Sequence, residues 1–189
     1  MDELCRDLAG RGWAAWNLEY RRLGGDGGWP ATFDDVGAGI DALGGVDALD
    51  LSRVVTIGHS AGGHLALWSA ARPGPRVRVT HAVAQAGVVD LVEAGRLGLS
   101  SGAADELVAS QREVFAEASP RALVPLGVPQ LLVHGEADSV VPVSIADGYA
   151  AAARAEGDAV DLVTLPDVGH FEHLDPGSEA WQTVVEWLP

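Results

Sequence analysis

The sequence predicts an α/β domain built on a mostly parallel, doubly wound sheet. Short apolar runs of four to eight residues, typical of strands buried on both faces, alternate with longer segments of helical periodicity. Strands separated by helical crossovers lie parallel, with helices on both faces of the sheet. The 189 residues suit one domain, and no linker or repeat divides them, so we expect a single domain over residues 1–189.

The first part of the chain predicts two helices and one strand. A helix over residues 3–9 should end at the glycines of positions 10 and 12, and the apolar run of residues 13–20 predicts a strand. A glycine-rich loop follows over residues 21–30. A helix then runs from Thr32 to about Leu43, because acidic residues in its first turn suit the helix dipole.

The remaining elements repeat the strand–helix order. The middle of the chain predicts a strand at 53–57, a helix at 61–71 and a strand at 77–86. A long connection over about 91–128 reads as a short cap-like insert that is partly helical around 104–118. The last part predicts a strand at 129–134, a helix at 144–156, a strand at 160–165 and a closing helix at 178–188.

Composition excludes several function classes. The formal net charge of −15 repels phosphate backbones and anionic membrane surfaces, so we expect neither nucleic acid nor a membrane as partner. Cys5 is the single cysteine, which excludes an intrachain disulfide framework and a cysteine zinc cluster. No apolar run is long enough to span a bilayer, and the first residues do not resemble a signal peptide, so we expect a cytoplasmic protein.

The strongest motif is Gly58-His59-Ser60-Ala61-Gly62, which lies between a predicted strand and a predicted helix. This is the pattern of a nucleophile elbow, a tight turn that lifts a serine side chain above the sheet. Small residues flank the serine because the turn is strained and backbones approach closely. The helix that begins at Ala61 points its free N–H groups towards the reacting centre.

A serine nucleophile needs a general base. Among the histidines we favour His170, because it lies in the loop after a late predicted strand and follows Gly169, which lets the chain turn. His173 is the rival, one helical turn further on. His59 should turn away from the serine and make a structural hydrogen bond, and His64 should be a packed polar residue of its helix. The other candidate histidines are His81 and His134.

The base needs an acid that fixes its tautomer. Asp138 lies just past the carboxyl end of the strand at 129–134, where a sheet of this class builds its site. Glu136 is nearer that strand, and Asp90 follows an earlier one, so both remain alternatives. With Asp138, the chain order is nucleophile, acid, base.

These residues resemble the α/β-hydrolase superfamily, and more narrowly its esterase and arylformamidase-like (kynurenine-formamidase-like) branch. The resemblance covers nearly the whole chain in order. It rests on Tyr20-Arg-Arg-Leu, Trp29-Pro-Ala-Thr-Phe-Asp-Asp, Gly58-His-Ser-Ala-Gly-Gly-His-Leu-Ala-Leu-Trp68, His134-Gly-Glu-Ala-Asp138, Val141-Pro142 and Gly169-His170-Phe.

The resemblance implies a serine hydrolase of esters or small amides with no metal and no organic cofactor. Ser60, Asp138 and His170 would form the catalytic triad, and the N–H of Ala61 would bind the oxyanion. Trp29 would line the entrance for a small-molecule substrate. Because the insert is short, a small or flat acyl group fits better than a long lipid chain.

One part of the family pattern is missing. The second oxyanion donor of the family comes from a His-Gly-Gly loop after its third strand, and no His-Gly-Gly occurs here. We therefore favour Met1 as an internal start of a longer protein, with the N-terminal strands of the fold lacking. The alternatives are that the strands at 13–20 and 53–57 close the gap directly, or that another chain fills it. Open sheet edges should then promote self-association. Two rival functions remain: a barely active hydrolase remnant without its oxyanion loop, and a serine peptidase of the oligopeptidase type.

Overall fold

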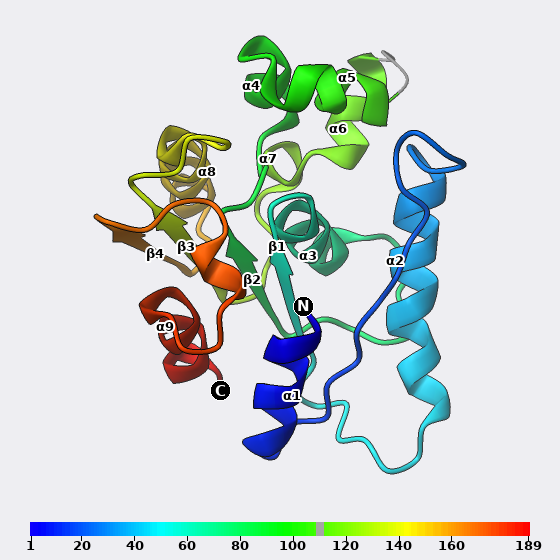
Figure 1. The fold of residues 1–189 in the computed structure, drawn as a ribbon. Coiled ribbons are helices and arrows are strands. Elements are labelled where there is room, and N and C mark those ends of the chain that lie inside the picture. The colour runs from blue at the N-terminus through cyan, green and yellow to red at the C-terminus, as the bar shows by residue number, and fades with distance from the viewer. Residues whose placement is uncertain (109–111) are drawn as a thin grey trace.

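The computed structural model describes residues 1–108 and 112–189, and these residues form a parallel sheet of four strands (Figure 1). The strands lie in chain order, β1-β2-β3-β4, and each pairs with the next in parallel. Their bounds are Val55–His59, His81–Gln85, Gln130–Gly135 and Val160–Leu165. The predicted fold class, a mostly parallel sheet covered by helices, is confirmed.

Side chains of the central strands alternate between two apolar cores. Ala84 and Leu132 belong to the larger core, whereas Val83 and Leu131 belong to the smaller core on the opposite face. The larger core is covered by α2 (Ala31–Asp41), α3 (Ala61–Ala71) and α8 (Val143–Ala155), and the smaller by α1 (Asp2–Gly10) and α9 (Glu179–Trp187) (Figure 1). This explains why the strands read as continuous apolar runs.

The two helices on the smaller core hold the chain ends together. The Ser178 hydroxyl caps α9 by accepting the backbone N–H of Trp181 at 3.1 Å. The ring of Trp181 is buried, and its Nε1 donates to Asp7 Oδ2 of α1 at 2.8 Å. Leu4 of α1 is buried in the same cluster. A pair of helices from opposite ends of the sequence therefore shields one face of the sheet.

Helix α3 is buried on several sides and is clamped by α2. Phe33 of α2 meets the ring of Trp68 edge-on, with centroids 4.8 Å apart. At the other end of α2, Asp41 accepts from Arg72 at 2.6 Å, and the guanidinium holds the pKa of this carboxyl down to about 2. These contacts fix the helix that follows the predicted nucleophile.

The long connection between β2 and β3 folds into short helical pieces rather than one helix. Its bounds are α4 Leu91–Arg96, η2 Leu99–Gly102, α5 Ala103–Leu107, η3 Arg112–Val114, α6 Phe115–Ala118 and α7 Pro120–Leu123, where η marks a 3₁₀ helix. A further 3₁₀ turn, η1, covers Ala42–Gly45, and η4 covers Glu172–Leu174. The predicted helical stretch around 104–118 is thus broken, and its residues 109–111 lie outside the described residues.

The predicted strand at residues 13–20 is wrong. In the structure these residues run extended but join no sheet, and among the described residues the backbone of 14–20 makes no hydrogen bond to another backbone group. A strand is defined by its partner as well as by its residues. The partner is lacking because a groove of about 1200 Å³, lined by Trp16 and Leu18 on one side and by Ile57 on the other, separates this segment from β1.

Strand β1 therefore has one free edge. The Ser60 N–H donates to the Gln85 carbonyl of β2 at 2.9 Å, and the Val54 carbonyl accepts from His81 at the start of β2 at 3.3 Å. Because backbone groups alternate along a strand, the groups of Val55, Ile57 and His59 point the other way, towards the groove. This edge is open, as the sequence led us to expect, but it belongs to β1 and not to residues 13–20. No helix among the described residues is long and apolar enough to cross a bilayer. The cytoplasmic location stays a prediction.

We expect the chain to self-associate through the β1 edge, because unpaired strand edges template pairing between copies. Light scattering across a dilution series should show the mean mass rising with concentration, more so in salt that screens the net charge of −15. Ile57→Lys, which places a charge beside the unpaired groups, should lower that mass. The matched control Val92→Lys adds the same charge at an α4 side chain that is 62% exposed and should leave it unchanged. A chain that stays monomeric, or equal effects of both variants, contradicts this prediction.

Candidate active site

The turn after β1 has the geometry of a nucleophile elbow. Ser60 takes φ 56° and ψ −117°, a conformation that non-glycine residues rarely adopt, and α3 begins at the next residue. The strain is held by the neighbouring strand: the Ser60 N–H donates to the Gln85 carbonyl at 2.9 Å, and the Ser60 carbonyl accepts from Val88 at 3.3 Å. The serine is thus fixed above the carboxyl end of the sheet.

Glycine at position 58 is required by the closeness of the turn. A Cβ at Gly58 would collide with the carbonyl of Gly62 in the first turn of α3. The helix can therefore start directly beside the strand that it follows. The N–H of Ala61, the first residue of the helix, has no partner inside the helix. The N-terminal end of α3 also places a partial positive charge beside Ser60.

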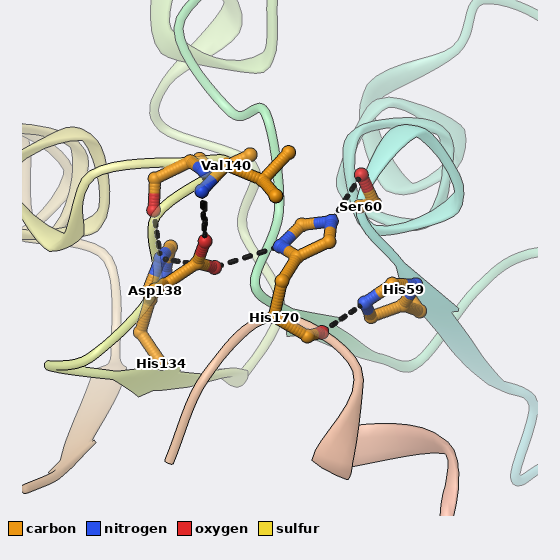
Figure 2. Close-up of polar contacts among 7 residues, drawn as sticks. His59, Ser60, His134, Asp138, Val140 and His170 are labelled. Atoms are coloured by element: carbon orange, nitrogen blue, oxygen red, sulfur yellow. Dashed lines mark hydrogen bonds and ion pairs between the residues drawn. The ribbon is translucent and has the colours of Figure 1, made fainter. Parts of the chain in front are cut away.

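The predicted acid lies in the loop after β3, residues 136–142, which we call the acid loop. Asp138 is fully buried at its side chain, and its Oδ1 accepts the backbone N–H groups of Val140 and Val141, each at 2.8 Å (Figure 2). Burial raises the pKa of this carboxyl. The hydrogen bonds from His170 and from the two backbone N–H groups together lower it by more than burial raises it, so the net pKa lies below its usual value. The group is therefore a carboxylate at neutral pH.

The loop after β4, residues 166–173, carries the predicted base, and we call it the base loop. His170 Nδ1 donates to Asp138 Oδ2 at 2.7 Å, and His170 Nε2 lies 3.0 Å from Ser60 Oγ (Figure 2). Since a carboxylate only accepts, Nδ1 carries the proton, and Nε2 is left free to accept the serine hydroxyl. The base loop passes close behind β3, where a Cβ at Gly135 would collide with the carbonyl of Val168. Residues 110 positions apart in the chain are thus in hydrogen-bond contact.

Three more histidines surround this chain of hydrogen bonds. His134 lies beside Asp138, with Nε2 2.9 Å from the Val141 carbonyl and 3.4 Å from Asp138 Oδ2. His59 Nε2 lies 2.6 Å from the backbone carbonyl of His170. Burial lowers the pKa of both imidazoles. The sequence predicted a structural hydrogen bond for His59, but nothing in it could name the partner.

His173, the predicted rival base, is fully buried, and among the described residues neither of its ring nitrogens has a hydrogen-bond partner. Burial lowers its pKa to about 4. The structure holds His173 through its backbone carbonyl, which accepts from the Gln85 side chain at 3.1 Å. It therefore takes no part in the hydrogen bonds that join Ser60, His170 and Asp138.

The other candidates lie outside this arrangement. Asp90 caps α4 by accepting the Glu93 N–H at 3.0 Å, and Glu136 is exposed. His81 stacks edge-on against Trp187 at the start of β2, the far end of the sheet. His64 bonds to the Ala118 carbonyl at 2.8 Å, as expected for a packed helix residue.

Trp29 packs at the larger core. Its ring meets that of Phe33 edge-on, with centroids 4.8 Å apart, and its backbone N–H donates to the Leu107 carbonyl at 2.7 Å. The structure records these contacts and none with Ser60 or His170, so a role in lining the substrate entrance stays a prediction. The role of the Ala61 N–H as an oxyanion donor likewise stays a prediction.

The described residues hold no cluster of three or more metal-ligating side chains.

Comparison with known proteins gives a family and a fold. The chain matches the prolyl oligopeptidase family over residues 9–188. A curated relative from Methylorubrum extorquens, named "Putative carboxymethylenebutenolidase", is 32% identical over an alignment of 71 residues, which covers 33% of this chain and 24% of that protein. The matched segment thus covers about a quarter of the relative's length, well short of its whole chain.

Solved structures agree on the architecture. Esterase B from Lactobacillus rhamnosis superposes with a TM-score of 0.81 at 20% identity, over 98% of this chain and 67% of that chain. A thermophilic esterase from Thermogutta terrifontis gives 0.74 at 21% identity, over 97% and 72%. An acetyl ester-xyloside bifunctional hydrolase from Caldicellulosiruptor lactoaceticus gives 0.73 at 23%, over 89% and 68%.

At these identities the likeness establishes the fold. The predicted resemblance to the α/β-hydrolase superfamily and its esterases is confirmed. The narrower arylformamidase-like branch stays a prediction.

The buried histidines predict a loss of stability in mild acid. Burial lowers the pKa of His64 from 6.5 to about 4, so between these values the unfolded chain binds a proton that the folded chain does not. The free energy of unfolding should therefore fall as the pH drops from 6.5 towards 4, by about 3 kcal/mol for this group. Urea unfolding of His64→Gln, which keeps a donor for Ala118, should show a shallower pH slope. An unchanged slope contradicts the assignment.

Proposed function

We propose that this chain, which belongs to the prolyl oligopeptidase family, is a serine hydrolase that cleaves a carboxylic ester or small amide through an acyl-enzyme. The observation that carries the proposal is the continuous hydrogen-bonded line from Ser60 through His170 to the buried carboxylate of Asp138, with distances of 3.0 Å and 2.7 Å. A serine hydroxyl is a weak nucleophile without such a base.

In the first half-reaction, Ser60 Oγ attacks the substrate carbonyl carbon while His170 Nε2 takes the hydroxyl proton. The imidazolium formed is stabilised by Asp138, which keeps its charge. The carbonyl π-electrons move to oxygen and give a tetrahedral oxyanion. When this collapses, the bond to the leaving group breaks, and His170 returns its proton to the departing alkoxide or amine.

In the second half-reaction, water takes the place of the serine hydroxyl. His170 Nε2 removes a proton from water, and the resulting hydroxide attacks the acyl carbon of the ester on Ser60. Collapse of the second tetrahedral intermediate releases the acid, and His170 protonates the serine oxygen. The free enzyme is regenerated, and each step uses only protein groups and water.

The oxyanion needs N–H donors placed before the reaction. We assign one to Ala61, whose N–H is free at the first position of α3, where the helix dipole also favours negative charge. A single missing donor costs about 10²- to 10³-fold in rate. The chain should therefore hydrolyse activated esters more readily than unactivated ones, because their transition states demand less stabilisation.

An ester is the favoured substrate class. The superposed structures are named esterases and an acetyl ester-xyloside hydrolase, and the curated relative is named for cleavage of a butenolide. The connection between β2 and β3 is built of short helices and leaves little room for a large cap. A small or flat acyl group suits it, with Trp29 at the entrance as we predicted, and an aryl formamide of the arylformamidase type is one such amide.

Two other functions compete. The match to the prolyl oligopeptidase family favours a peptidase that uses the same three residues. A barely active remnant is the third candidate, and the preformed hydrogen bonds of Ser60 and Asp138 argue against it. Rates on p-nitrophenyl acetate and on a proline-containing peptide p-nitroanilide separate the three, because the two assays release related chromogenic groups from an ester and from an amide.

Ser60→Ala should abolish ester hydrolysis and leave the fold intact, because the hydroxyl is the nucleophile and its removal empties no core. The rate on p-nitrophenyl acetate should fall by about a thousandfold or more. A fluorophosphonate probe, read by mass spectrometry, should label Ser60 in the wild type. Labelling of another serine, or activity above that level in the variant, moves the nucleophile elsewhere.

His170→Ala and Ser60→Ala should be strongly non-additive, because the two side chains act as one unit. The double variant should be about as slow as either single variant, measured on the same ester. His173→Ala is the comparison, since that side chain lies behind the line of hydrogen bonds. Equal losses in His173→Ala and His170→Ala, with both proteins folded by circular dichroism, would move the role of base away from His170.

A further inference from the structure

A hydrogen bond from His59 joins β1 to the base loop, and the proposed mechanism gives it no role. His59 ends β1, one residue before Ser60, and its Nε2 lies 2.6 Å from the backbone carbonyl oxygen of His170 (Figure 2). A carbonyl only accepts, so the proton is on Nε2 and His59 is the donor. The ring is half-buried, and burial lowers its pKa, which keeps it neutral near pH 7.

Packing supports the hydrogen bond. The rings of His59 and His170 lie with centroids 4.6 Å apart at 55°, and Phe171 lies 6.0 Å from His59 on the same side. The side chain of His59 therefore touches both the ring of the base and its backbone. These two contacts can therefore fix the position of the His170 imidazole.

The other ties of the base loop lead elsewhere. The Val168 carbonyl accepts from Ala137 in the acid loop at 3.1 Å, and the His173 carbonyl accepts from Gln85 of β2. Among the described residues, the hydrogen bond from His59 is the one that joins β1 to this loop, apart from the contact between Ser60 and His170 itself. The strand that carries the nucleophile is thus linked to the base by one side chain that does not react.

We propose that His59 is a positioning residue: by donating to the His170 carbonyl, it sets the distance between Ser60 Oγ and His170 Nε2. The inference rests on the proposed hydrolase function. A misplacement of about 1 Å in an active site can cost about 100-fold in rate, so a single anchor at this place has a large effect.

A neutral donor suits this position. The groups that face His59 are His170 on the base loop, His173 on η4, Asp138 beyond His170, and the α-amino group of Met1, which precedes α1. During the reaction His170 becomes a cation. A permanent cation at position 59 would repel it at about the ring separation seen here, whereas a neutral imidazole holds the carbonyl without that repulsion.

The test compares His59→Leu with His59→Gln. Leucine fills space without a donor, whereas the glutamine amide can donate to the same carbonyl. On p-nitrophenyl acetate, kcat should fall by about 10- to 100-fold in His59→Leu with KM little changed. His59→Gln should recover most of that loss. In the Ser60→Ala background, amide hydrogen exchange of residues 168–172 should be faster with leucine at position 59 and unchanged with glutamine.

The outcomes separate the two claims. If fluorophosphonate does not label Ser60 in the wild type, the hydrolase function fails, and the exchange measurement still decides whether His59 anchors the loop. If Ser60 is labelled but His59→Leu keeps the wild-type kcat and exchange, the positioning role is overturned. A loss in His59→Gln as large as in His59→Leu also overturns it, because the donor would then not be what matters.

Discussion

The site depends on one geometric constraint: the carboxyl ends of all strands in a parallel sheet lie on the same side of the sheet. Ser60 follows β1, Asp138 follows β3 and His170 follows β4, so the three side chains meet although the chain visits them far apart in sequence. The sheet fixes the backbone at each strand end, and the backbone in turn places the three side chains. Gly58 and Gly135 are two of the places where backbones come so close that a Cβ would collide, and both lie at strand ends beside the site.

Burial determines which side chains are charged at the carboxyl ends of the strands. Asp138 has no exposed side-chain surface, yet it stays ionised because three N–H groups compensate its lost hydration. The neighbouring imidazoles of His59, His134 and His173 respond in the opposite sense, since burial disfavours their charged forms. A single carboxylate surrounded by neutral rings results. In the proposed reaction, the imidazolium would form on His170, directly beside this carboxylate.

The sequence predicted those features that depend on local pattern. The bounds of α3 and β4 agree with those expected, and the elbow, the acid and the base come together as proposed from the motif and the chain order. Features that depend on a partner were not predictable in this way. Residues 13–20 have the composition of a strand but no backbone to pair with, and β1 begins two residues later than its apolar run. The partner of His59 is likewise a tertiary fact, because a carbonyl 111 residues away leaves no trace in the local pattern.

The predicted nucleophile follows β1, an edge strand of the sheet, so contacts outside the sheet help to hold it. Strand β1 is paired on one side only, so its register depends on β2 and on the helix above it. The strained φ of Ser60 is held by Gln85 and Val88 on the paired side and by α3, which Phe33 clamps in turn. On the unpaired side, the described residues offer the backbone of β1 no backbone hydrogen bond. The side chain of His59 instead reaches the loop after β4, and in the proposed positioning role this link fixes Ser60 relative to His170.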